Sequence, residues 1–205
     1  MFLNRRFRSR GFVVGAICFG IAVLFSAQAF CAETLKYLAL VDGGKEAGHQ
    51  TVVHGDDGVS RVDFIFKDNG RGPELKEEYV LAADGTFATY SVKGTSTFGA
   101  PVDEQFRIEN GMAVWKSTSD AGELPLQEGA AYSPLGGSPQ GLSVALSALS
   151  RRSDGKLPLI PSGTLTMRQV AEVEVVKGAE KRKVQLVMLT GVGFTPTFVW
   201  ATTEA

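Results

Sequence analysis

Residues 62–73 decide the fold of this chain, and their sequence is VDFIFKDNGRGP. Val62, Phe64 and Phe66 occupy alternate positions, and the positions between them are polar except for Ile65. Alternate residues of a β-strand point to opposite faces of the sheet. The first half of the stretch therefore predicts a strand with one buried face.

The second half of the same stretch predicts the end of that strand. Asp68 and Asn69 favour a turn because their side chains can bond to the nearby backbone. The glycines on either side of Arg71 accept positive φ angles, and Pro73 has no N–H group for a sheet ladder. Arg71 is therefore expected in an exposed turn between two glycines.

Asn69 and Arg71 are the candidate contact residues of this turn, for a ligand or a partner protein. A guanidinium group offers a fork of donors that matches a carboxylate. The alternative is structural: Arg71 could bond to carbonyl groups of its own loop, or pair with Asp68 or Glu74.

The N-terminus has the layout of a signal peptide. Four arginines between positions 5 and 10 precede residues 11–25, which contain no charged or strongly polar side chain. A membrane-spanning helix needs about 20 apolar residues, so this segment is short for a permanent anchor. We predict a signal peptide over residues 1–29, with cleavage after Cys31 as the open alternative. The protein is then exported to the periplasm or the extracellular space and leaves the membrane.

Signal removal changes both charge and cysteine content. Four of the 21 basic residues and none of the 22 acidic residues lie in the signal, which leaves 17 against 22 and a net charge of −5. An acidic chain without a basic patch argues against nucleic acid as a partner. Cys18 leaves with the signal, so no internal disulfide can form. Residues 33–205 are expected to form a single β-rich domain that a hydrophobic core stabilises.

Short β-like stretches follow the signal, with Gly-Gly, Asp-Gly and Asn-Gly turns between them. Besides the strand in residues 62–73, the predicted strands are 35–41, 46–54, 75–81, 86–92, 105–108, 112–116 and 183–190. This order predicts an antiparallel meander. Residues 117–137 are rich in small and turn residues, and they predict a long surface loop with at most a short strand near 130–132.

One helix is predicted over residues 139–152. Ser138 suits the N-cap, and Pro139 suits the first helical position. Its apolar stripe comprises Leu142, Leu146 and Leu149. The residues from 157 to 161 then lead into the longest alternation of the chain, which assigns one face to Leu165, Met167, Ala171, Val173 and Val175. The predicted fold class is mainly β: a strongly curved antiparallel sheet or half-open barrel, with the helix covering its concave side or one open end.

The sequence offers little chemistry of its own. His49 and His54 are five residues apart, so on one strand they would point to opposite faces and could not share a metal ion. No His-x-His, cysteine cluster or G-x-S-x-G motif occurs after the signal. Residues 136–141, GGSPQG, have the glycine spacing of a phosphate loop but lack its lysine, and a capped turn at Ser138 explains them.

Two pairs of adjacent carboxylates also argue against catalysis. The pairs are Glu77 with Glu78 and Asp103 with Glu104. Neighbours along a strand point to opposite faces, so neither pair can act as an acid and a base together. We predict no catalytic, metal-binding or cofactor-binding residue in this chain.

Four segments resemble, in order and spacing, the N-terminal β-rich region of secreted bacterial proteins of the amidohydrolase family. They are KDNGRGP at 67–73, GAPVDE at 99–104, LPLIPSG at 157–163 and GVGFTPT at 191–197. In that family this region precedes a metal-dependent (β/α)₈ hydrolase barrel, which carries the His-x-His ligands. The resemblance implies a non-catalytic accessory domain, truncated before the barrel, whose partner is a barrel domain or its separate chain. A divalent metal is expected only in that barrel.

A second interpretation belongs to a different class of protein. A free-standing periplasmic carrier could hold an apolar ligand between its curved sheet and the helix. Hydrolysis by the isolated chain would require a bound metal ion, for which the sequence offers no ligands. The accessory domain, which the resemblance implies, is the preferred interpretation.

Overall fold

The computed structural model describes residues 33–202. The predicted signal peptide over residues 1–29 and the alternative cleavage point at Cys31 lie outside the described residues. The elements, in chain order, are β1 (Glu33–Val41), η1 (Asp42–Gly44), β2 (Lys45–His54), β3 (Ser60–Phe66), β4 (Glu74–Leu81), β5 (Phe87–Thr95), β6 (Pro101–Glu109), β7 (Met112–Lys116), β8 (Ala121–Pro125), β9 (Ala131–Tyr132), α1 (Pro139–Ser150), β10 (Lys156–Ile160), β11 (Thr164–Lys177), β12 (Glu180–Thr190) and β13 (Thr197–Thr202). The predicted fold class is confirmed: this part of the chain is mainly β, with one α-helix.

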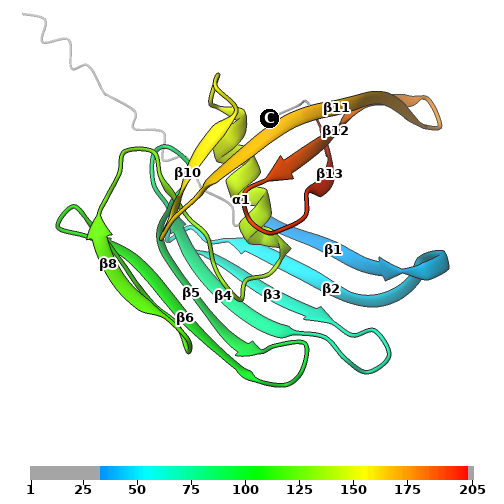
Figure 1. Cartoon of the computed structure of the whole chain (residues 1–205). Coiled ribbons are helices and arrows are strands. Elements are labelled where there is room, and N and C mark those ends of the chain that lie inside the picture. Colours follow the sequence, from blue (N-terminus) through cyan, green and yellow to red (C-terminus); the bar gives the residue numbers. More distant parts are fainter. Residues whose placement is uncertain (1–32, 203–205) are drawn as a thin grey trace, which may run out of the picture. The chain divides into compact units, whose positions relative to one another are not determined.

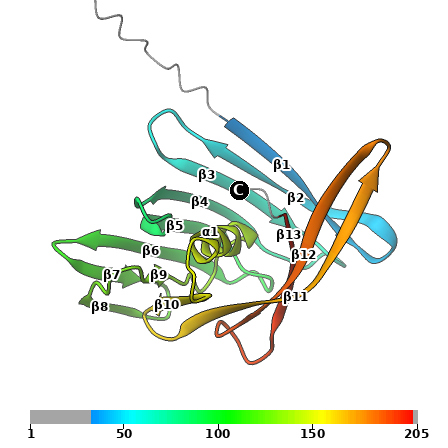
Figure 2. The same cartoon turned by 90° about the horizontal axis from the view of Figure 1, so that it is seen from above.

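Strands β1 to β8 form one eight-stranded antiparallel meander, in which each strand pairs with its neighbours in sequence. The sheet curves strongly, as Figures 1 and 2 show, and its concave face carries the larger of two cores. Alternate residues along each strand point into this core. Cross-strand partners therefore form rows of side chains across the concave face.

The stretch that begins in β3 folds as predicted. Val62 and Phe64 are buried, and Phe66 is half-buried against the same core. Asp68 and Arg71 exchange two backbone hydrogen bonds, of 2.9 Å and 2.8 Å, around a two-residue turn. Asn69 occupies that turn with a φ of 50°, followed by a glycine in the same left-handed region.

Helix α1 lies between the two sheets (Figure 2). Ser138 is its N-cap and accepts a 3.2 Å hydrogen bond from the Gln140 N–H, as the sequence predicts. Val144 faces the core of the first sheet, whereas Leu149 faces the core of the second. No helix among residues 33–202 has the length and hydropathy needed to span a membrane.

The second sheet has the order β13-β12-β11-β10-β9. Its pairs are antiparallel except for β9 and β10, which run parallel. Strands β8 and β9 lie in the segment 117–137, which we expected to be mostly loop, and β10 lies in the expected lead-in. β8 has little intrinsic β preference. It forms because β7 offers it an open edge to pair with.

The expectation that one face of β11 carries all five of its alternating apolar residues is wrong. Gln169 and Ala171 pair with consecutive residues of β12, so Val170 between them is an extra residue, a β-bulge. A bulge shifts the alternation by one residue and exchanges the two faces beyond it. Leu165 and Met167 pack against the second core with α1, and the apolar residues after the bulge point the opposite way.

This exchange extends onto β11 an apolar surface of β12 and β13, and we call the whole surface the outer apolar face. It lies on the side of β11–β13 opposite to α1 and comprises Ala171, Val173, Val175, Val184, Leu186, Met188, Phe198 and Trp200. Cross-strand pairs such as Leu186 with Trp200 and Met188 with Phe198 make it continuous across three strands. The α1 side of the same hairpin tip is charged, with Lys183 3.1 Å from Glu172.

Phe106 tests the core of the first sheet. It is 3% exposed and stacks on Tyr132 with ring centroids 4.3 Å apart. We expect Phe106→Ala to lower the free energy of unfolding by ~3–5 kcal/mol, because the cavity left behind cannot close. Phe98 is 84% exposed, so Phe98→Ala should change the free energy of unfolding by less than ~0.5 kcal/mol. Urea denaturation measures both, and equal losses would contradict this assignment of the core.

Candidate functional site: two buried carboxylates beneath a loop

Two carboxylates interrupt the apolar rows of the concave face. Glu77 of β4 and Glu104 of β6 both pair with Val92 of β5, one from each side. They therefore share one row, two strands apart, and each is only 2% exposed. Glutamate is rarely buried to this extent without partners, so the question is what satisfies each charge.

Glu104 is satisfied by donors from the segment after β8. The Tyr132 hydroxyl donates to Oε1 at 2.6 Å. The Leu135 N–H bonds both oxygens, at 3.0 Å and 3.2 Å, and the Gly136 N–H donates to Oε2 at 3.1 Å. Charge-assisted hydrogen bonds of this kind are about twice as strong as neutral ones. They fix the segment of residues 133–138, which we call the clasp loop.

Glu77 holds the other end of the clasp loop. Its Oε1 accepts a hydrogen bond from the N–H of Ser138, the N-cap of α1. Its Oε2 has no hydrogen-bond partner among the described residues. Burial raises the pKa of Glu77 above its ordinary value, although the hydrogen bonds from Ser138 act in the opposite direction.

The Glu77 contact explains the segment that has the glycine spacing of a phosphate loop. A helix N-terminus favours a negative group, through its free N–H groups and its dipole. Here the protein supplies that group itself, from the neighbouring sheet. The predicted capped turn at Ser138 is observed.

Tyr90 of β5 lies beneath the clasp loop. It is 2% exposed, and its hydroxyl has no hydrogen-bond partner of normal geometry in the described part of the chain. Burial and then the charge of Glu77 raise its pKa. A Cβ atom added to Gly137 would lie 2.8 Å from the Tyr90 hydroxyl, so the loop can approach this closely only with glycine there.

Sequence reasoning missed this site because it compared each carboxylate with its neighbour in sequence. Glu77 and Glu78 do point to opposite faces, as expected. The relevant partners lie two strands apart, in register. One signal could have found them: Glu77 and Glu104 each occupy an inward position between apolar neighbours two residues away on either side.

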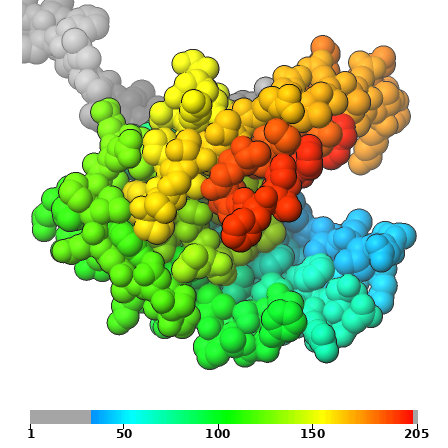
Figure 3. All heavy atoms as spheres, in the orientation of Figure 1, coloured from blue at the N-terminus to red at the C-terminus, as the bar shows by residue number. Residues whose placement is uncertain are grey.

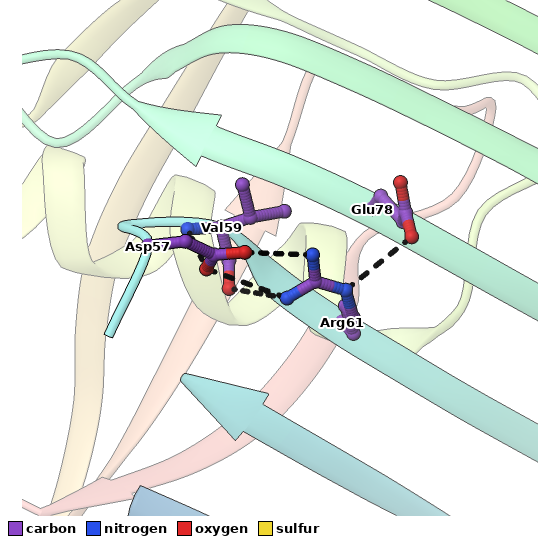
Figure 4. A network of polar contacts seen from close by, with 4 residues as sticks. All are labelled: Asp57, Val59, Arg61 and Glu78. Carbon is purple, nitrogen blue, oxygen red and sulfur yellow. Dashed lines mark hydrogen bonds and ion pairs between the residues drawn. The ribbon is translucent and has the colours of Figure 1, made fainter. Parts of the chain in front are cut away.

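The exposed neighbour Glu78 belongs to a polar network with Arg61 and Asp57 (Figure 4). On the convex side it lies 3.4 Å from Arg61, which also pairs with Asp57 at 2.8 Å. The hydrogen bond from Arg61 lowers the pKa of Asp57. Exposed pairs of this kind contribute about 0–1 kcal/mol each, so this network is a minor part of the stability.

Neither buried carboxylate lines the pocket on the far side of the clasp loop. The pocket on the far side of the clasp loop has a volume of about 260 Å³. Its walls come from the clasp loop, α1, β10 and β11, and no charged side chain lines it. The two carboxylates therefore position the loop, and the loop forms a wall of a mainly apolar pocket.

The predicted contact residues Asn69 and Arg71 lie elsewhere, in the exposed turn between β3 and β4. The Arg71 side chain forms no ion pair among the described residues. Glu74 pairs instead with Lys67, at 2.9 Å. Neither Asn69 nor Arg71 lines the pocket beside the clasp loop, and their role as contacts stays a prediction.

The two histidines lie on β2 and on opposite faces, as expected from their spacing. His49 is exposed, and His54 Nδ1 lies 2.8 Å from the hydroxyl of Ser60. Within residues 33–202, no three side chains of the metal-binding types come together.

The raised pKa of Glu77 predicts a dependence of stability on pH. The folded protein holds the Glu77 proton more tightly than the unfolded chain does. The stability gained from protonation is therefore full below the ordinary pKa of 4.5 and is lost as pH rises through the raised pKa. Glu77→Gln keeps an oxygen for the Ser138 N–H and cannot ionise. Relative to wild type, its unfolding free energy should rise as the pH increases from about 4 through the raised pKa of Glu77.

Glu78→Gln is the matched control, because Glu78 is its exposed neighbour on the other face. Urea denaturation of the three proteins across this pH range measures the difference. Parallel curves for wild type and Glu77→Gln would show that the buried carboxyl does not titrate differently in the folded state.

In comparisons with protein-family models, curated proteins and solved structures, the chain matches none of them. The four segments that resemble the amidohydrolase leader region lie at the β3–β4 turn, the β5–β6 turn, β10 with the residues after it, and the β12–β13 connection. That resemblance stays a prediction, carried by these residues alone.

Proposed function

We propose that this chain is a non-catalytic accessory domain that docks onto a metal-dependent hydrolase barrel of the amidohydrolase type. The barrel would supply the metal ligands and the hydrolytic chemistry. This chain would supply a folded β-rich surface. The observation that carries the proposal is the outer apolar face of β11–β13.

The outer apolar face has the composition of a protein-binding surface. Val173 and Val175 are 42% and 46% exposed, and Phe198 and Trp200 are 57% and 54% exposed. Continuous apolar patches on a soluble domain commonly mark an interaction site. Tryptophan, moreover, is enriched among the residues that dominate binding energy at interfaces.

The β-bulge at Val170 supports this reading of the surface. Without the extra residue, the valines after it would lie on the α1 side and the charged residues would lie outside. The observed arrangement puts the apolar side chains on the exposed side. A docked partner would remove them from water, which is a favourable change for each buried side chain.

Trp200 tests the docking proposal. The partner in the test is a zinc-loaded amidohydrolase barrel from the same genome, purified separately. We expect a complex on size-exclusion chromatography, and Trp200→Asp should weaken it at least about tenfold, because a charge would be buried in the contact. Calorimetric titration measures the affinity.

Phe98→Asp is the matched control. Phe98 is an exposed aromatic residue in the turn between β5 and β6, and it does not belong to the outer apolar face. It should bind like wild type. Arg71→Ala in the same titration tests the predicted contact turn, with weaker binding and an unchanged melting temperature as the expected result. Failure of the wild-type chain to bind any such barrel would refute the proposal.

A second candidate function is a carrier for a small apolar ligand. Two pockets beside α1 favour it. One is the pocket behind the clasp loop, and the other, of about 290 Å³, lies between the start of α1 and the first sheet. In the space-filling view the surface is also hollowed between the orange β11–β12 hairpin and the blue β1–β2 hairpin (Figure 3).

Native mass spectrometry tests the carrier function on protein purified from its own host. A carrier should retain a small molecule or take up 1-octanol, and Ala145→Phe should reduce uptake by filling the pocket behind the clasp loop. Ser147→Phe adds the same ring on the exposed side of α1 and should have no effect. A protein that is empty and takes up nothing would exclude this candidate.

A further inference from the structure

The pocket between the first sheet and the start of α1 contains one buried polar side chain, that of Gln50. It is lined by Tyr37, Leu38, Ala39, Gln50, Phe64, Pro139 and Ser143. None of these side chains is charged. The pocket therefore suits an uncharged molecule, because a charged one would lose its hydration without gaining a partner.

Gln50 lies in the middle of a cross-strand row in this pocket. It pairs with Tyr37 of β1 on one side and with Phe64 of β3 on the other. All three face the concave side, so an aromatic ring flanks the Gln50 amide on each side. Such a row offers apolar faces to a flat ligand and one polar group between them.

The Gln50 amide is only half satisfied. Its Nε2 donates to Gln140 Oε1 at 3.3 Å, and Gln140 Nε2 donates in turn to the Tyr79 hydroxyl at 3.0 Å. Gln50 is 8% exposed, and its Oε1 has no hydrogen-bond partner in the described residues. A buried acceptor without a donor is unfavourable, and most such atoms in folded proteins have a partner.

We propose that this pocket binds a small, uncharged aromatic molecule that donates one N–H or O–H hydrogen bond to Gln50 Oε1. Tyr37 and Phe64 contact its ring, and Pro139 and Ser143 of α1 line the opposite side of the pocket. The assignment rests on the second candidate function, a carrier, and is independent of docking at the outer apolar face.

Size is consistent with this class of ligand. An apolar cavity of about 150 Å³ holds benzene in another protein. A pocket of about 290 Å³ therefore accommodates a bicyclic ring such as indole. Indole also carries a single N–H donor and no charge, which makes it a suitable probe.

The experiment compares indole with 1-methylindole, in which a methyl group replaces the N–H proton. We expect indole to bind at least about tenfold more tightly, because a site with a buried acceptor rejects an analogue that lacks the donor. 3-Methylindole controls for the size of the added methyl group, since it keeps the N–H, and it should bind much as indole does. Backbone amide shifts measure the three affinities and locate the site.

Gln50→Leu removes the acceptor with little change in shape. The variant should bind indole and 1-methylindole with similar affinity, and a thermal melt should show that it folds. His49→Leu is the matched control, because His49 is the neighbouring residue on the opposite face of β2, and it should keep the wild-type preference. If Gln50→Leu does not fold, the test is whether the wild-type protein binds indole more tightly than 1-methylindole.

Two results would overturn the assignment in different ways. Equal binding of indole and 1-methylindole by wild type would leave an apolar pocket but remove the role of Gln50. If the protein binds none of the three probes, the proposed ligand site is refuted, and the carrier function loses this support. Trp200→Asp should leave indole binding unchanged, so neither result bears on docking.

Discussion

The hydrogen bonds between two buried carboxylates and the clasp loop connect the first sheet to the helix that packs on it. Glu104 accepts from Tyr132 and from two loop N–H groups, and Glu77 accepts from Ser138 at the start of α1. These contacts fix the path of the chain from the first sheet to the helix. α1 in turn supplies Leu149 to the core of the second sheet. Two side chains of β4 and β6 therefore position the start of α1.

The second constraint is the extra residue in β11. Val170 exchanges the faces of the strand, so the valines beyond it become exposed while a charged pair occupies the other side. An uninterrupted alternation would have produced an ordinary amphipathic strand. Because of the bulge, the two halves of β11 differ. The apolar residues before it pack in the core with α1, and those after it lie on the outer apolar face.

The features that the sequence predicted are local ones. The alternation of Val62 and Phe64, the turn at Asn69 and the N-cap at Ser138 each follow from residues within a few positions of one another. β8, the bulge and the pairing of Glu77 with Glu104 across β5 depend on strand register, which local patterns do not specify. Register also places Gln50 between two aromatic rings. The fold class was therefore predictable. The sequence could also have placed Glu77 and Glu104 at inward positions, but not their pairing across β5.

The meander of the first sheet has a consequence for how the chain folds. Its strands pair with immediate neighbours, so the contact order of this half is low and its hairpins can form early. The Tyr132–Glu104 bond joins residues 28 positions apart, the Ser138–Glu77 bond joins residues 61 apart, and the Gln50–Gln140 bond spans 90. Closing such loops costs more chain entropy. We expect the first sheet to form before the helix docks, with its carboxylates exposed to water until the last step.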